Sequence, residues 1–282
     1  GGLPREMEMR NTDPEAVTAE ALTDKHARAA ERSMANYAFC FGATNDNLDA
    51  VKAVDRRLAC GVKVFMGSST GNMLVDDERT LEGIFAASPL VIATHCEHTP
   101  TIAANEAAAR ARYGENIPFS EHPRIRSAEA CYRSSSLAVE LARRHDARLH
   151  VLHITTAREL DLFHPGGLAT KRITAEACVH HLFFDDTSYA TKGANIKCNP
   201  AIKTAADQQA LWRAVNDGRI DVIATDHAPH TLAEKTRPYP NSPAGMPGVE
   251  TSLPLMLTAM QAEQCTLAQV QQWMCSGPAR VY

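Results

Sequence analysis

Hydrophobic residues recur along the chain as short runs, and the segments between them carry one apolar face. The run at 90–94 is apolar up to its last residue. The segment at 47–59 instead places Leu48, Val51 and Leu58 at the spacing of one helix face. Short apolar runs separated by helical patterns are typical of buried parallel strands joined by helices. The pattern predicts an α/β fold made of βαβ units.

Seven runs have the length and residue types of strands. They lie at residues 7–9, 37–41, 62–66, 90–94, 149–153, 172–178 and 220–225. Helices are expected at 14–32, 47–59, 77–87, 101–113, 127–144 and 205–216. This alternation fits an open doubly wound sheet or a closed barrel.

Polar residues at the ends of the predicted strands favour the barrel. Asn11, His95, His153, His180 and Asp226 each stand at the C-terminal end of a different strand. A TIM barrel assembles its chemistry from several strand ends, whereas an open sheet uses one switch point, often with a Gly-rich phosphate loop. The sequence has no such loop. We predict a TIM (β/α)8-type barrel that is incomplete, because seven strands are one short of eight.

Composition narrows the class of protein. The 282 residues are 44% hydrophobic and 22% charged, which fits one globular domain over residues 1–282. The 29 Lys and Arg against 33 Asp and Glu give a net charge of −4, so we expect neither nucleic acid nor a membrane surface as partner. Eight cysteines without a Cys-x-x-Cys pair indicate a reduced, cytoplasmic protein.

Four residues carry the candidate chemistry: Lys63, His95, His153 and Asp226. Imidazole nitrogens and carboxylate oxygens bind Zn²⁺, and a buried lysine that has reacted with CO₂ becomes a carboxylate able to bridge two metals. Two adjacent metal ions can activate water and polarise a carbonyl. Each residue alone also has a structural explanation, as a hydrogen-bonded histidine, a lysine at a strand end or a helix cap. Their positions on four separate strands favour a metal site.

Longer motifs surround these residues. They are Gly-Val-Lys-Val-Phe-Met at 61–66, Thr-His-Cys-Glu at 94–97, His-Val-Leu-His-Ile-Thr at 150–155 and Ile-Ala-Thr-Asp-His-Ala-Pro-His-Thr at 223–231. In these motifs the chain resembles the dihydroorotases of the amidohydrolase superfamily. The resemblance implies a zinc-dependent hydrolase with a binuclear centre that interconverts dihydroorotate and N-carbamoyl-aspartate in pyrimidine biosynthesis. It also allows a homodimer.

The resemblance assigns a role to each residue. Lys63 would be the carboxylated lysine between the metals, His95 and His153 ligands of the second metal, and Asp226 a ligand of the first metal and the general acid and base. The positions that match substrate contacts in the family are Asn11, Asn199, His230, Pro243 and Gly245.

The sequence also departs from the family. No His-x-His motif stands before Asn11, and the chain ends at Tyr282, where relatives continue. We therefore expect it to lack the first barrel strand and a C-terminal β subdomain. On this interpretation the chain alone binds one zinc ion or none and is weakly active or inactive.

Three alternatives stay open. The first is a hydantoinase or allantoinase, although the Ala-Pro-His motif at His230 favours dihydroorotase. The second is a homologue without activity, and the third is a barrel of other chemistry. His180 and His181 either pack beside the site, which we prefer, or bind metal, and Glu97 either orients His95 or lies in solvent. The remaining expectation is that His26, His122, His145 and His164 lie on the surface.

Overall fold

Seven parallel strands make up the sheet of the computed structural model, which describes residues 5–9, 15–67 and 74–282. Each strand pairs with the next one along the sequence. The strands are β1 (Arg5–Glu8), β2 (Asn36–Gly42), β3 (Gly61–Phe65), β4 (Ile92–His95), β5 (Leu149–Val151), β6 (Ile173–Cys178) and β7 (Val222–Ala224). All seven predicted strands are confirmed, in the predicted order.

Helices connect the strands. The α-helices are α1 (Ala19–Arg32), α2 (Leu48–Lys52), α3 (Glu78–Ala87), α4 (Thr99–Tyr113), α5 (His122–Ile125), α6 (Ala128–Arg144), α7 (Val179–Phe183), α8 (Tyr189–Lys192), α9 (Ala205–Asp217), α10 (Leu232–Lys235), α11 (Ser252–Gln261), α12 (Leu267–Gln271) and α13 (Gly277–Val281). Short 3₁₀ segments lie at Phe119–Glu121, Arg158–Leu162, Leu168–Thr170, Asp186–Ser188, Gly193–Ile196 and Tyr239–Asn241, and a π turn at Gln272–Ser276. None of the described helices is long and apolar enough to cross a bilayer.

Two predicted helices are shorter than expected: α1 begins at Ala19 although the pattern predicted a helix from 14, and the second is α2. The pattern at 47–59 predicted a helix throughout, but α2 ends at Lys52. The Asp55 carboxylate accepts the backbone N–H of Arg57 at 2.8 Å and also pairs with the Arg57 guanidinium. Such local side-chain bonds compete with a continuing helix.

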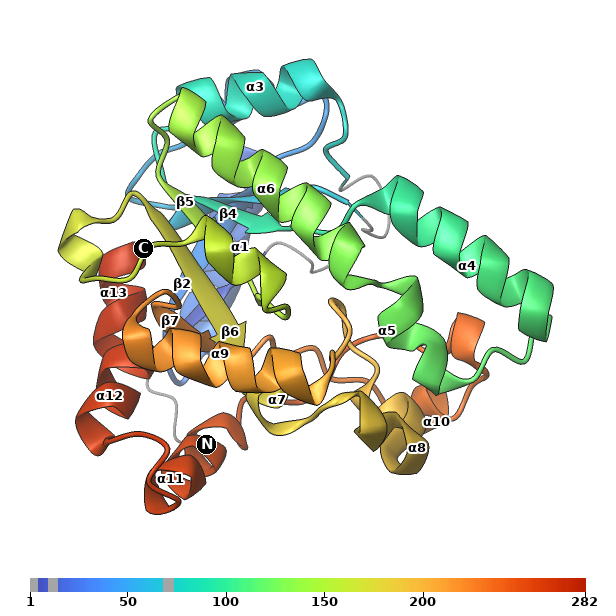
Figure 1. Ribbon diagram of the computed structural model, residues 1–282. Coiled ribbons are helices and arrows are strands. Elements are labelled where there is room, and N and C mark those ends of the chain that lie inside the picture. The colour runs from blue at the N-terminus through green and yellow to red at the C-terminus, as the bar shows by residue number, and fades with distance from the viewer. Residues whose placement is uncertain (1–4, 10–14, 68–73) are drawn as a thin grey trace.

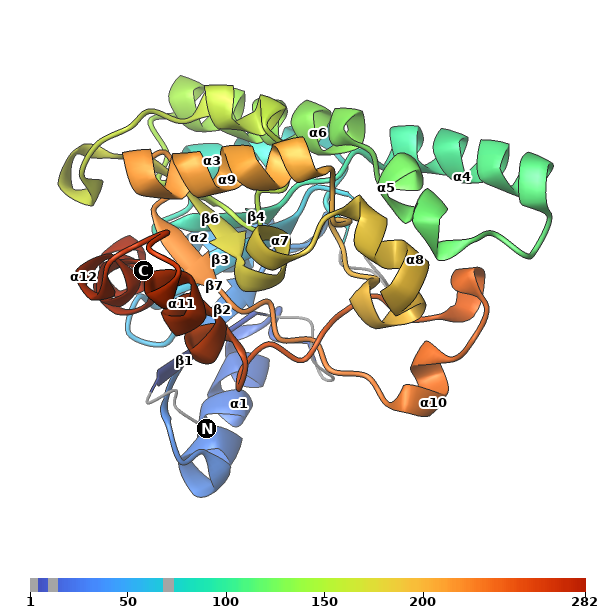
Figure 2. The same ribbon diagram turned by 60° about the horizontal axis from the view of Figure 1, so that its bottom comes forward.

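The sheet curls at the centre of the molecule, with helices packed outside it (Figure 1). β1 and β7 stand at the two ends of the strand order, so the arrangement is that of an incomplete barrel, as predicted. Figures 1 and 2 show α4, α5, α8 and α10 together at one end of the molecule and α11 to α13 at the other. Because α4 follows directly on β4, the first of these ends is the carboxyl end of the sheet.

Burial explains why the central strands are continuous apolar runs. Every residue of β3, β4 and β5 is buried, as parallel strands covered on both faces require. Side chains such as Val62, Ile92 and Leu149 join one large core with the inner faces of α3, α6 and α9. Lys63 is the charged exception within β3, with 3% of its surface exposed.

Candidate functional site

The four predicted ligands lie within or just after four different strands. Lys63 is in β3 and His95 is the last residue of β4, while His153 and Asp226 each follow two residues after β5 and β7. Lys63 interacts electrostatically with the other three side chains. The structure therefore places all four in one electrostatic neighbourhood, with a direct contact between His95 and His153.

The two histidines of this set face each other. Nδ1 of His95 lies 3.0 Å from Nε2 of His153, and both side chains are buried. The other ring nitrogen of His95, Nε2, lies 3.0 Å from Oε2 of Glu97. A carboxylate only accepts, so Nε2 of His95 carries the proton and its Nδ1 presents a lone pair to His153.

Glu97 is held in place by a second partner. Its carboxylate is fully buried and pairs with the guanidinium of Arg126. Burial alone would raise the pKa of Glu97, but Arg126 and His95 lower it to about 2. The carboxylate therefore stays charged and orients His95, so one of the two interpretations of Glu97 is confirmed.

Burial also sets the protonation of the predicted ligands. It lowers the pKa of Lys63 to about 8, although the Asp226 carboxylate acts in the opposite direction. It lowers the pKa of His95, and holds the pKa of His153 well below its usual value with help from His95 and Lys63. Both imidazoles are thus neutral near pH 7, the form that binds metal. The pKa of Asp226 is raised to about 6 by removal of its carboxyl from water, with Lys63 lowering it again.

His153 and Asp226 also share an unusual backbone conformation. Their φ angles are 39° and 43°, in the left-handed region that non-glycine residues seldom adopt. Each residue follows the end of a strand, where the turn directs its side chain. Such strain persists only where the surroundings enforce it, and it gathers at functional sites.

These residues fit a divalent metal ion. Zinc binds imidazole nitrogen at about 2.0–2.1 Å, so two nitrogens 3.0 Å apart can share one ion. A carboxylate on the far nitrogen of a ligating histidine, as Glu97 provides for His95, is the usual support of such a ligand. Nδ1 of His153, the nitrogen that faces away from His95, is buried without a hydrogen-bond partner among the described residues.

The predicted substrate contacts within the described residues lie in three loops: Asn199 before α9, His230 after β7, and Pro243 with Gly245 before α11. Nε2 of His230 is 3.2 Å from the backbone oxygen of Ala244, between the predicted residues Pro243 and Gly245. Gly245 has φ 140°, and a Cβ atom there would lie 3.2 Å from that same imidazole nitrogen. The buried Oδ1 atom of Asn199 has no partner within the described chain. The remaining predicted contact, Asn11, lies outside the described residues.

One histidine prediction is wrong. His122 was expected on the surface, but it is 1% exposed and bridges Tyr239 Oη at 2.7 Å and the backbone oxygen of Cys198 at 2.8 Å. Burial lowers its pKa to about 3. The prediction rested on a helix or loop context, whereas contacts with distant segments bury the side chain. His180 and His181 are also buried.

Two residues of the site were not predicted. Arg126, which pairs with Glu97 from 29 positions away, carries no local signal that sequence alone could have revealed. Glu176 contacts Nε2 of His150 at 3.1 Å and accepts the backbone N–H of His153 at 3.4 Å. Its signal was available, because a carboxylate inside the apolar strand β6 requires partners.

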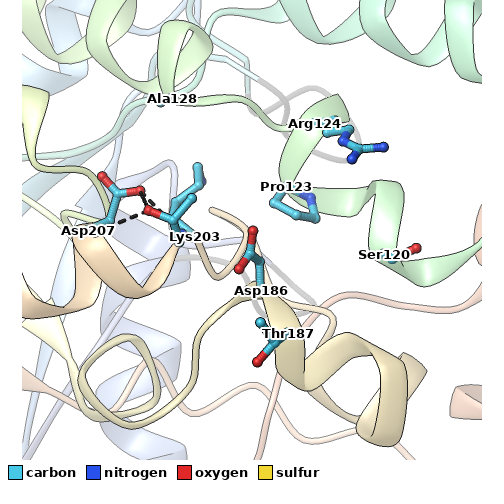
Figure 3. Close-up of a pocket in the computed structure, with 9 residues that line it drawn as sticks. Ser120, Pro123, Arg124, Ala128, Asp186, Thr187, Lys203 and Asp207 are labelled. Atoms are coloured by element: carbon cyan, nitrogen blue, oxygen red, sulfur yellow. Dashed lines mark hydrogen bonds between the residues drawn. The ribbon is translucent and has the colours of Figure 1, made fainter.

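A cavity of about 450 Å³ lies outside this cluster. Figure 3 shows Ser120, Pro123 and Arg124 on one wall and Asp186, Thr187, Lys203 and Asp207 on the other. The carboxylate of Asp207 caps its own helix through Thr204. The four predicted ligands are not among the residues lining this cavity, so it provides no enclosed chamber around them.

Known proteins resemble the chain over its whole length. It is 32% identical over 284 residues to a dihydroorotase of Halobacterium salinarum, an alignment that covers 100% of this chain and 64% of the relative. It is 29% identical over 286 residues to an allantoinase of Streptomyces avermitilis, covering 100% and 63%. The solved L-hydantoinase (dihydropyrimidinase) of Arthrobacter aurescens matches with a TM-score of 0.92 and 25% identity, covering 100% of this chain and 64% of that one.

No family model matches the chain. The chain spans just under two thirds of the length of the relatives described above. The sequence similarity extends over the whole chain, and the structure matches the barrel of a solved hydantoinase. Together these two findings confirm the predicted amidohydrolase-type barrel. The chain is therefore similar, over its whole length, to dihydroorotases and to related cyclic amidases.

Proposed function

We propose that residues 1–282 form one domain of a dihydroorotase, a metal-dependent enzyme that reversibly hydrolyses the cyclic amide of dihydroorotate to N-carbamoyl-aspartate in pyrimidine biosynthesis. One observation carries the proposal: Lys63, His95, His153 and Asp226 converge from four strands, with both imidazoles neutral. The sequence relatives named dihydroorotase support the choice of substrate.

The metal would be held by His95 and His153, with Lys63 in its carboxylated form between this ion and a second one. A divalent ion, for which we propose zinc, supplies Lewis acidity that makes an amide carbonyl a better electrophile and water a better nucleophile. The Lys63 amine, whose pKa is about 8, is neutral in an appreciable fraction of molecules near pH 7 and can react with CO₂. Asp226 would be a ligand of that other ion, which is the first metal in the assignment given by the resemblance.

Asp226 is the proposed general acid and base. With a pKa of about 6 it is mostly ionised at pH 7, so it can accept the proton of the attacking water. Once protonated, the same carboxyl can return that proton to the departing ring nitrogen. Asn199, His230 and the backbone at Pro243 and Gly245 would bind the substrate, and Asn11 would contribute from outside the described residues.

The experiment is a comparative assay. Protein expressed from the complete reading frame that contains these residues is loaded with Zn²⁺ and given dihydroorotate, hydantoin and allantoin in parallel. We expect dihydroorotate to have the highest kcat/KM, and Lys63→Ala and Asp226→Asn to lower it by at least about 10³-fold. Lys52→Ala, at an exposed lysine, is the matched control.

A second candidate function is that of a hydantoinase or allantoinase. The allantoinase of Streptomyces avermitilis and the hydantoinase fold favour it. A higher kcat/KM for hydantoin or allantoin would select this candidate. A folded, zinc-loaded protein that hydrolyses none of the three would instead be a homologue without activity.

Two further proposals concern the cellular compartment and the oligomeric state of the protein. All eight cysteines, each within the described part of the chain, are free thiols, which supports a reducing compartment such as the cytoplasm. A homodimer is the assembly we propose to test first, by light scattering of the purified protein.

A further inference from the structure

A second group of ligand-type side chains lies at the end of β6. Cys178 is the last residue of that strand, and His180 and His181 stand in the first turn of α7. Their ligand atoms lie within 4.8 Å of one another. All three residues are buried, with His180 8% and His181 3% exposed. None of the three belongs to the proposed catalytic set.

The two imidazoles present nitrogens that the chain does not satisfy. Nε2 of His180 and Nδ1 of His181 are buried without a hydrogen-bond partner in the described structure. Nε2 of His181 lies 3.1 Å from the backbone oxygen of Pro200. Since a carbonyl only accepts, that nitrogen carries the proton and Nδ1 of His181 keeps its lone pair. A buried lone pair without a donor requires an explanation, such as a bound ion or water.

The protonation states of the two imidazoles agree with metal binding, whereas burial raises the pKa of the Cys178 thiol well above its usual value, so the ion must displace that proton. Burial lowers the pKa of His180 to about 4 and that of His181 well below its usual value. Both imidazoles are therefore neutral at ordinary pH, and a positive ion meets no ring charge there. The Cys178 thiol supplies a third, soft donor.

We propose that Cys178, His180 and His181 form a separate binding site for a zinc-like divalent ion. A thiolate with two imidazoles selects ions of this borderline-soft class over Mg²⁺ or Ca²⁺. Tetrahedral zinc holds such ligand atoms about 3.3–3.6 Å apart, so rotation about the side-chain bonds closes the set, with the fourth position left to solvent. Binding forms the metal–sulfur bond and releases the thiol proton to solvent.

The two sites can be distinguished by their donor atoms. Lys63, His95, His153 and Asp226 contain no sulfur, so only the second site can give a sulfur-to-metal charge-transfer band. This proposal does not rest on the proposed function, because its readout needs no substrate. Failure of either one leaves the other intact.

The experiment is a titration of the metal-free full chain with Co²⁺, monitored in the near ultraviolet and visible. We expect a sulfur-to-cobalt band and the visible bands of a tetrahedral ion. Cys178→Ser should abolish the ultraviolet band, and elemental analysis should show one ion fewer per chain. His181→Ala should weaken the Co²⁺ affinity of this site by more than about 100-fold, because loss of a ligand costs more than loss of its supporting residue.

Two other buried cysteines serve as controls. Cys131 lies away from the cluster, with its Sγ 3.8 Å from Thr155 Oγ1, so Cys131→Ser should leave the band unchanged. Cys198→Ser is the more stringent control, because the Sγ atom of Cys198 lies 3.8 Å from Nε2 of His181. It too should leave the band unchanged. Circular dichroism of each variant verifies folding. Absence of a sulfur-to-cobalt band in the wild-type chain, or a band that survives Cys178→Ser, overturns the proposal; only water then occupies the cluster.

Discussion

Nδ1 of His95 and Nε2 of His153 meet at 3.0 Å across the ends of two adjacent strands. Parallel pairing of β4 with β5 places Thr94 beside Val151, so the two histidines emerge at the same edge of the sheet. The lone pair of His95 points at His153 because Glu97 holds the proton on the opposite nitrogen. The geometry of the proposed metal ligands thus depends on a carboxylate that would not itself touch the metal.

The first prediction concerns this carboxylate. Glu97→Gln keeps the shape of the side chain but removes its charge and leaves Arg126 without an anion. We expect the affinity for Zn²⁺ to fall by about 10–100-fold, the usual effect of losing such a supporting group. Competition with a chelator of known affinity measures the affinity for Zn²⁺.

Glu106→Gln, on α4, is the control. It changes a half-buried carboxylate that pairs with Arg110 and should leave the affinity unchanged. An equal loss in both variants would contradict the role given to Glu97.

The second prediction concerns the modification of Lys63. Two lysines have a pKa lowered to about 8 by burial, Lys63 and Lys197. Nζ of Lys197 donates to the backbone oxygens of Tyr239 and Ser242, each at 2.6 Å, so its ammonium form is held by acceptors. Lys63 alone of the pair stands among the proposed ligands, and we expect only Lys63 to react with CO₂ to form a carbamate.

The measurement is carbon NMR of zinc-loaded protein in ¹³C-bicarbonate. A carbamate resonance should be present in the wild-type chain and in Lys197→Met, and absent in Lys63→Met. A resonance that persists without Lys63 would show that another amine reacts.

Much of the fold could be predicted from sequence, and the candidate ligands could be selected from it, because both have a local signal. Lys63 and His95 interrupt or end apolar strands, and a charged or polar side chain at such a position needs partners. The strand order follows from βαβ alternation, since consecutive parallel strands joined by helices become neighbours. These features need no knowledge of which distant residues meet.

The support around the ligands was not accessible, because it depends on contacts between distant segments. Arg126 reaches Glu97 from a loop between α5 and α6, and His122 reaches Tyr239 across 117 positions. Neither contact has a periodicity or a motif. The charge state of Glu97 likewise follows from its burial beside Arg126, which only the folded chain reveals.

The third prediction concerns acid stability. The pKa of His122 is about 3 in the fold against 6.5 for a free imidazole, so the unfolded chain binds one more proton between these values. The free energy of unfolding therefore falls as the pH drops below 6.5, by about 1.4 kcal/mol per pH unit for this residue. In His122→Asn the slope between pH 4 and 6 should be shallower by that amount. Urea unfolding at several pH values measures it.

A control variant separates the pH dependence of the free energy of unfolding from its value at pH 7. His122→Asn also loses part of the bridge to Tyr239 and Cys198, which lowers stability at pH 7 by about 1–3 kcal/mol. His164→Asn, at an exposed histidine, should change neither quantity. An unchanged slope in His122→Asn would show that His122 takes up its proton in the folded chain as easily as in the unfolded one.

The fourth prediction concerns the close approach of two strand ends at Gly67. This residue has φ 147°, and a Cβ atom there would lie 1.5 Å from the backbone oxygen of Glu97. Gly67→Ala must therefore push the end of β3 away from the segment that carries His95 and Glu97. We expect it to lower the free energy of unfolding by more than about 3 kcal/mol. It should also weaken Zn²⁺ binding, because the two site-bearing segments separate.

Gly114 provides the matched control for this substitution. Its φ is 61°, but no atom lies within 4 Å of the Cβ position, so Gly114→Ala incurs backbone strain without a clash. We expect a loss of about 1–3 kcal/mol from backbone strain at this positive φ, with ψ −137°, and unchanged metal affinity. Chemical unfolding and zinc titration of both variants make the comparison. Equal losses of stability in Gly67→Ala and Gly114→Ala would contradict this prediction. They would mean that the segment after β4 moves aside freely at Gly67, so that the spacing of β3 and β4 does not fix the position of His95.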